Sequence, residues 1–118
     1  MAVCYVSLKP RDAFSQIERG LTERFFSAEL ISSHVTRSAA GREETEIGVF
    51  EKYSFRNGNR MTLTVLCSPH GKDGCEVYYV AAGAGSGLLG LFDGGAAEAF
   101  ERAVEKSLEG VLIRADGE

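Results

Sequence analysis

The sequence predicts an α+β fold, in which a curved antiparallel sheet of five strands carries two helices on one face, in the order β-α-β-β-β-β-α. Two segments space their apolar residues three or four apart, as one face of a helix does. Five segments are rich in β-formers and alternate apolar with polar residues, as strands with one buried face do. The connections between the last four strands are short, so we expect these strands to be antiparallel neighbours.

The N-terminal part is expected to hold a strand over residues 2–8, followed by a helix that Asp12 can cap. The buried stripe of this helix comprises Phe14, Ile17, Leu21 and Phe25. Gly20 lowers the stability of the helix by about 1 kcal/mol relative to alanine. Either the packing of the stripe outweighs that cost, or another element approaches the backbone closely at Gly20.

Four further strands follow. The weakest is expected over residues 28–36 and the next over 46–56, where Ile47, Val49, Tyr53 and Phe55 form the apolar face and Phe50 lies opposite. The last two strands direct these residues to the core: Met61, Leu63, Val65 and Cys67, then Cys75, Val77, Tyr79 and Ala81. Tyr78 therefore lies on the open face. Asn57-Gly58 marks a hairpin between strands, because both residues tolerate positive φ.

The C-terminal part is a glycine-rich connection at 83–95, a helix that Asp93 can cap, and a helix end near Gly110. Residues 113–118 are expected to form a polar tail, and residues 1–118 a single domain. In shape this order of elements resembles the TATA-binding-protein-like fold or a short helix-grip fold. That likeness implies no function.

The composition excludes several classes of protein. With 17 acidic residues against 13 Lys and Arg, the net charge is -4, so nucleic acid is not an expected partner. No segment approaches the roughly 20 apolar residues of a membrane helix, so no membrane partner is expected either. Three cysteines, an odd number without a C-x-x-C pair, indicate free thiols and a cytoplasmic location.

The glycine-rich connection contains a G-x-G-x-x-G pattern at Gly85, Gly87 and Gly90. A dinucleotide site also needs a second parallel strand with an acidic residue, for which too little chain remains. The connection is interpreted as a strand-to-helix link, with an anion held by its backbone N–H groups as the alternative. Its four large apolar residues either pack under the last helix or form a lid or contact: Leu88, Leu89, Leu91 and Phe92.

The nearest approach to a metal site is formed by Cys67, His70 and Cys75. Structural zinc takes four ligands, and both cysteines occupy core positions, so we expect no metal and no cofactor. A redox-sensitive disulfide is the remaining alternative. No serine, histidine and acid stand in a catalytic pattern, so no catalytic residue is assigned.

Glu51 lies on the predicted apolar face of its strand. Such an acid is expected either at the margin of the sheet or paired with an arginine, for which Arg60 is the candidate, near a pocket.

Residues 50–66 combine a Tyr-x-Phe strand, a Gly-Asn-Arg turn at 58–60 and alternating apolar residues. This segment resembles the central hairpin of a family of small bacterial proteins known only as a domain of unknown function. The likeness continues through the glycine-rich stretch into the helix that begins near residue 95 and covers nearly the whole chain. It implies no activity, ligand or catalytic residue.

The leading functional hypothesis is a non-enzymatic binding module for a small apolar ligand, held between sheet and helices or beneath the glycine-rich connection. The alternative is a homo-oligomeric interaction protein that uses an aromatic patch on the open side of the sheet. An enzyme of unknown type is the third option. The candidate ligand or interface residues are Phe50, Glu51, Arg60, Tyr78, Leu88, Leu89, Leu91 and Phe92.

Overall fold

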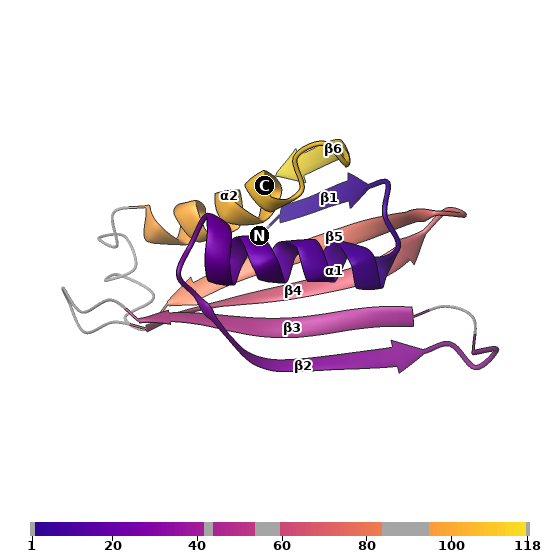
Figure 1. The fold of residues 1–118 in the computed structure, drawn as a ribbon, viewed down its shortest axis with the longest axis horizontal. Helices are drawn as coiled ribbons and strands as arrows, with labels where there is room; N and C mark the ends of the chain where they lie inside the picture. The colour runs from indigo at the N-terminus through magenta and orange to yellow at the C-terminus, as the bar shows by residue number, and fades with distance from the viewer. Residues whose placement is uncertain (1, 42–43, 54–59, 84–94, 118) are drawn as a thin grey trace.

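One antiparallel sheet of six strands carries both helices on the same face (Figure 1). The structure, a computed structural model, describes residues 2–41, 44–53, 60–83 and 95–117. In chain order the elements are β1 (Ala2–Val6), α1 (Pro10–Arg19), a short π-helix η1 (Gly20–Arg24), β2 (Glu29–Arg37), β3 (Glu44–Tyr53), β4 (Arg60–His70), β5 (Gly74–Gly83), α2 (Ala96–Ser107) and β6 (Leu112–Gly117). The α+β class and the antiparallel sheet with two helices are confirmed.

The sheet has one strand more than predicted. The strands lie in the order β2-β3-β4-β5-β1-β6, so the N-terminal strand lies between β5 and β6. Residues 113–118 were predicted as a polar tail, but residues 112–117 form β6, which pairs antiparallel with β1. An edge strand has only one neighbour and keeps charged residues such as Arg114, which is why its sequence resembles a solvated tail.

The first helix begins without the predicted side-chain cap. Lys9 is the N-cap residue and makes no side-chain cap hydrogen bond, while Pro10 occupies the first helical position. Proline suits this position because its missing N–H would have no partner there. Asp12 lies in the first turn, where its negative charge interacts favourably with the helix dipole.

The helix widens into η1 at Gly20, and this changes which residues face the core. The N–H of Phe25 donates to the carbonyl of Gly20 at 2.8 Å, five residues back, instead of the usual four. Leu21 is still buried, as predicted, but Phe25 is only half-buried. The prediction that Phe25 continues the buried stripe is wrong, because the π-helical turn breaks the 3.6-residue period.

Gly20 allows a close approach between helices. A Cβ atom at this position would lie 1.8 Å from Oγ of Ser107 in α2. Gln16 reinforces the crossing, since its Nε2 donates to the carbonyl of Ser107 at 3.0 Å. The second of the two readings of Gly20 is therefore correct: another element packs against its backbone.

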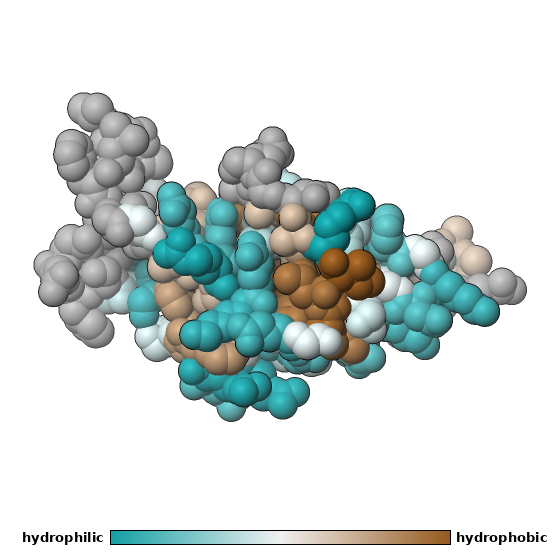
Figure 2. Space-filling model, turned by 90° about the horizontal axis from the view of Figure 1, so that it is seen from above, coloured by the Kyte–Doolittle hydropathy of each residue, from teal (hydrophilic) through white to brown (hydrophobic). Residues whose placement is uncertain are grey.

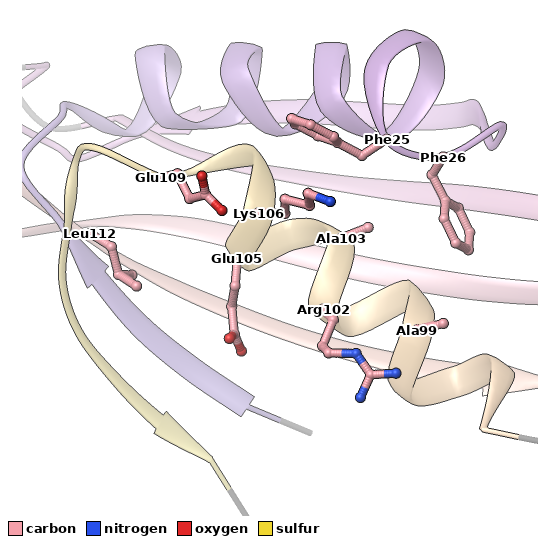
Figure 3. A pocket seen from close by; sticks show the side chains of 9 residues that line it. All are labelled: Phe25, Phe26, Ala99, Arg102, Ala103, Glu105, Lys106, Glu109 and Leu112. Carbon is pink, nitrogen blue, oxygen red and sulfur yellow. The ribbon is translucent and has the colours of Figure 1, made fainter.

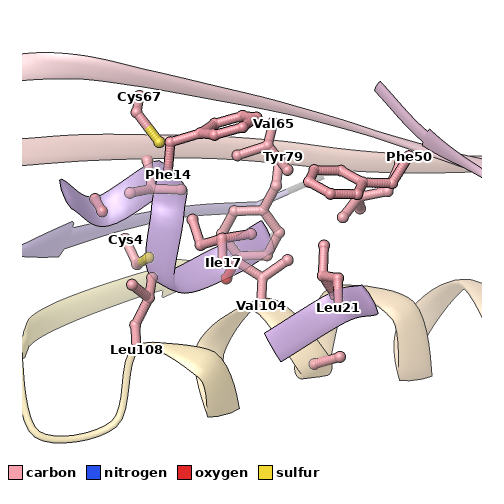
Figure 4. Close-up of a cluster of buried hydrophobic side chains, with 14 of the residues drawn as sticks. Cys4, Phe14, Ile17, Leu21, Phe50, Val65, Cys67, Tyr79, Val104 and Leu108 are labelled. Carbon is pink, nitrogen blue, oxygen red and sulfur yellow. The ribbon is translucent and has the colours of Figure 1, made fainter. Parts of the chain in front are cut away.

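The core lies between the sheet and the helices (Figure 4). Its largest fully buried side chains come from both layers: Tyr79, Phe14, Phe50, Phe100, Ile17, Leu21, Leu63 and Leu108. The predicted inward faces of β4 and β5 are confirmed, with Leu63, Val65 and Cys67 buried opposite Cys75, Val77 and Tyr79.

The predicted facing of β3 is wrong. Glu46, Gly48 and Phe50 face the core, whereas Ile47 is 37% exposed and Tyr53 is 43% exposed on the other side. The cause is Gly48, where a Cβ atom would lie 2.3 Å from the ring of Phe14. The missing side chain at Gly48 leaves space on the core face, and the ring of Phe14 fills it. The pattern of apolar residues does not reveal such a space.

Candidate functional site

Phe50 does not belong to the open surface that the sequence predicted. It is fully buried, and its ring stacks on Phe14 with 5.9 Å between the ring centroids. Because β3 is turned over relative to the prediction, Phe50 exchanges places with its neighbours Val49 and Ile47. The aromatic pair of Phe50 and Tyr78 therefore does not form, and Phe50 is a core residue.

Tyr78 lies on the open face, in a row of cross-strand neighbours that spans five strands. The register pairs His34 with Ile47, Ile47 with Leu66, Leu66 with Tyr78, and Tyr78 with Val3. Four of these five side chains are apolar or aromatic, and both helices that the structure describes cover the opposite face.

A second, shorter row lies beside the first, in which Val49 pairs with Thr64 and Thr64 with Val80. Together the two rows form an apolar patch that we call the open-face band: Val3, Ile47, Val49, Leu66, Tyr78 and Val80. All except Ile47 are half-buried. Antiparallel sheets commonly leave one face in water, but such a face is normally polar.

Polar side chains close one end of the band. The hydroxyl of Tyr5 donates to Glu76 at 3.1 Å, and the guanidinium of Arg114 lies 4.5 Å from the centroid of the Tyr5 ring. The ring of His70 approaches the same tyrosine, at 4.7 Å between centroids.

Glu51 and Arg60 close the other end, at 3.9 Å from Oε2 to Nη1. The guanidinium of Arg60 also lies 5.7 Å from the centroid of the Tyr53 ring. Arg60 opens β4 and His70 ends it, so the two lie roughly 33 Å apart along an extended strand. A catalytic group made of Glu51, Arg60 and His70 does not assemble.

The three cysteines lie side by side on the core face of the sheet. Cys4 pairs with Val77 and Val6 with Cys75, while Cys67 pairs with Val77 from the other side. All three are free and fully buried. Burial raises the pKa of the Cys4 thiol to about 12, and the pKa of Cys67 is also raised, first by its hydrogen bond with Cys75 and then by burial.

Within the described parts of the chain, no group of three or more His, Cys, Asp or Glu residues is arranged to hold a metal ion. His70, the third residue of the predicted weak metal site, is exposed, whereas Cys67 and Cys75 are core residues.

A groove of about 580 Å³ lies on the outer side of the helix layer, where the end of η1 meets α2 (Figure 3). Its apolar lining comprises Phe25, Phe26, Ala99, Ala103 and Leu112. Both phenyl rings are half-buried, and Phe26 stacks on the core residue Phe100 at 4.7 Å between centroids. The groove thus has one wall anchored in the core.

Charged side chains complete the lining of the groove. Lys106 extends from α2 towards Phe25, and its Nζ lies 5.3 Å from the centroid of that ring (Figure 3). Arg102 and Glu105 extend from the other flank of α2, and Glu109 lies near its end. The carboxylate of Glu105 is bound by a core residue, because it accepts a 2.5 Å hydrogen bond from the hydroxyl of Tyr79.

Exposed apolar residues continue from the groove onto the edge strand β6. Leu112 is 39% exposed and Ile113 is 67% exposed. Figure 2 views the molecule from the side on which β6 lies and shows a compact, strongly hydrophobic patch there.

No pattern in the sequence predicts this groove. Phe25 was placed in the buried stripe, and Phe26 and Lys106 were not singled out. The sequence does contain one indication of an exposed aromatic surface, the consecutive residues Phe25 and Phe26. Adjacent residues of a helix point in different directions, so both rings cannot belong to the same buried stripe. Leu88, Leu89, Leu91 and Phe92 lie outside the described residues, and their role stays a prediction.

The fold and its surfaces define an α+β protein of two layers, with a sheet that is open on one side. Residues 1–112 match the family described as a family of unknown function (DUF6054), and the chain belongs to this family. No curated protein and no solved structure matches the chain. In the described part of the chain, no helix is long and apolar enough to cross a membrane.

Proposed function

We propose that the protein is a non-enzymatic interaction protein that forms a homodimer through the open face of its sheet. The open-face band is the observation that carries this proposal. Its six apolar or aromatic residues lie in two adjacent rows, on the face opposite both described helices. A contiguous apolar patch of this kind is typical of a protein–protein contact.

The size of the face supports a second copy as the partner. Strands β2 to β5 have nine to eleven residues each. At roughly 3.3 Å per residue and 4.8 Å between strands, these four long strands cover about 33 Å by 19 Å, and the shorter β1 and β6 widen the face further. That area is comparable with the roughly 800 Å² that each partner buries in a standard interface.

The charges around the band support the same partner. Glu51 lies beside Arg60, and Glu76 accepts from Tyr5, against whose ring Arg114 lies. At the end formed by Glu51 and Arg60 the acidic and basic groups are therefore paired within one copy, which lowers the cost of bringing two such faces together.

The test is sedimentation of the wild type and of a Leu66→Lys variant, which places a charge at the centre of the band. We expect the wild type at twice the monomer mass of 12.7 kDa and the variant at the monomer mass, with unchanged far-ultraviolet circular dichroism. Val80→Lys is the second variant if Leu66→Lys does not fold.

Ile113→Lys is the matched control, because it makes the same change on β6, outside the band, at a residue that is already 67% exposed. It should remain a dimer. A wild type that is monomeric at micromolar concentration would overturn the proposal, and so would a Leu66→Lys variant that remains dimeric.

The second candidate function is the binding of a small molecule. The space between the sheet and the helices is filled by core side chains such as Phe14, Phe50 and Tyr79, so that space is not the proposed site. The groove beside α2 favours this candidate, because its volume lies within the 300–1,000 Å³ range that is typical of ligand pockets.

We also propose the bacterial cytoplasm as the location. Three free, buried thiols suit a reducing compartment. Nucleic acid and membranes are not among the proposed partners, given the net charge of -4.

A further inference from the structure

We infer that the groove beside α2 binds an amphipathic anion: a molecule with a hydrocarbon or aromatic body and a single carboxylate or sulfonate group. This inference rests on the second candidate function, small-molecule binding, and is independent of the homodimer. It names both the place and the chemical class of the ligand.

The shape of the groove accounts for the apolar body. Phe25 and Phe26 follow η1, whose wider turn moves Phe25 out of the core stripe. The opposite wall is built from the small side chains Ala99 and Ala103 of α2, which leave room beside the two rings. A flat or extended hydrocarbon fits between two phenyl rings and a wall of methyl groups.

The charges around the rings account for the anionic group. Arg24 and Lys106 both lie over the ring of Phe25, at 5.0 and 5.3 Å from its centroid. Lys52 lies 4.8 Å from the centroid of Phe26. Three cations therefore lie over the two rings, and one of them, Lys106, lines the groove itself, in a protein whose net charge is negative.

The acidic residues of the groove do not cancel this positive charge at the rings. Glu105 extends from the opposite flank of α2 and accepts the hydroxyl proton of Tyr79. Glu109 lies three residues beyond Lys106 near the end of α2, on the side away from Phe26. The Lys106 ammonium is thus the group best placed to meet a carboxylate or sulfonate whose hydrocarbon body lies against Phe25.

The test uses the dye 1-anilinonaphthalene-8-sulfonate, which combines an aromatic body with one sulfonate and fluoresces when it leaves water. We expect one dye per chain in the wild type. Lys106→Met keeps the aliphatic stem and removes the charge, so we expect about a tenfold weaker affinity. Lys72→Met is the matched control, an exposed lysine in the turn between β4 and β5, and should leave the affinity unchanged.

Displacement of the dye separates charge from hydrophobicity. Decanoate should displace the dye from the wild type, whereas decanol, with the same chain and no charge, should do so much more weakly. Equal displacement by both compounds would overturn the anionic class. If Lys106→Met and Lys72→Met weaken the affinity for the dye equally, the dye is attracted by positive charge in general, and the proposed site is wrong.

The same titration on the Leu66→Lys variant distinguishes this inference from the homodimer. Dye binding that persists in this variant places the dye away from the open-face band, whatever the oligomeric state. Dye binding that is lost in Leu66→Lys but retained in Lys106→Met would place the dye on the open face and overturn the inference.

Discussion

The ring of Phe14 occupies the space that a side chain at position 48 would fill. A Cβ atom on Gly48 would lie 2.3 Å from the tip of that ring. This contact turns Phe50 towards the core and Ile47 towards the open face, and it thereby sets the composition of the open-face band.

We therefore expect Gly48→Ala to destabilise the fold by about 1–3 kcal/mol, because the Phe14 ring must move out of a filled core. Urea denaturation measures the change in the free energy of unfolding. Gly83→Ala is the control, since its Cβ atom would make only ordinary contacts, the nearest at 3.7 Å. Equal losses for the two variants would contradict the role given to Phe14.

Gly20→Ala tests the crossing of the helices. Alanine is the better helix former by about 1 kcal/mol, so helix propensity alone predicts a gain in stability. We expect a net loss, because the new methyl group would meet the Ser107 side chain. In a double-mutant cycle with Ser107→Gly, the loss should shrink. A stabilised Gly20→Ala protein would contradict the close approach.

The dependence of stability on alkaline pH tests the buried thiols. Burial raises the pKa of Cys4 from its usual 9.0 to about 12, so between these values the unfolded chain loses a proton that the folded protein retains. The folded state then binds more protons, and stability falls as pH rises, by about 1.4 kcal/mol per pH unit for this thiol. Below pH 9 the thiol makes no pH-dependent contribution.

Unfolding by urea with a reducing agent, repeated from pH 8 upward, measures this slope. Cys4→Ala should flatten it by that amount. Val6→Ala is the control, because it also truncates a buried residue of β1 but removes no titratable group, so it should lower stability without changing the slope.

Glu46 is expected to lower stability near neutral pH. Burial raises the pKa of its carboxyl group, although Arg11 opposes the shift from 3.4 Å. The folded protein therefore favours the protonated carboxyl group. This contribution to stability is fully present below the unfolded pKa of 4.5 and is lost as pH rises through the pKa of the folded state. Glu46→Gln should therefore be more stable than the wild type at pH 7 and nearly as stable as the wild type at pH 4.

Glu44→Gln is the control for that change. Glu44 lies 3.2 Å from Arg37 and 3.6 Å from Arg11, so its neutralisation should be slightly destabilising. A loss of stability in Glu46→Gln at pH 7 would mean that the pair with Arg11 outweighs the burial of the carboxylate.

The sequence was sufficient for the elements that obey one period throughout. Strands β4 and β5 alternate without interruption, so the inward positions of Leu63 and Tyr79 follow directly. For β3, the sequence predicts the wrong face as the buried one. Gly48 faces the core and leaves space for the Phe14 ring, but a glycine gives no hydrophobic signal that its position is buried. β6 was missed because an edge strand can be as polar as a tail.

The candidate sites were less predictable, since both depend on which elements meet. The position of Tyr78 on the open face followed from alternation alone, but its neighbours Ile47 and Val49 depended on the phase of β3. The groove requires the π-helical turn at Gly20 and the approach of α2. Gly20 indicated a close approach, but no local pattern specified the π-helical turn or which element approaches.

The place of β1 between β5 and β6 also bears on the order of assembly. Tyr5 meets its partner Glu76 only across 71 positions of chain, whereas β2 to β5 join neighbours in sequence. On a ribosome, β1 emerges well before its partner β5, and both precede β6, so β1 stays without its neighbours until β5 and β6 have been synthesised. Because closing a long loop costs more entropy than joining sequence neighbours, we expect the pairing of β1 to follow that of β2 to β5. Until it forms, the apolar side of β1 with Cys4 and Val6 lacks its native cover.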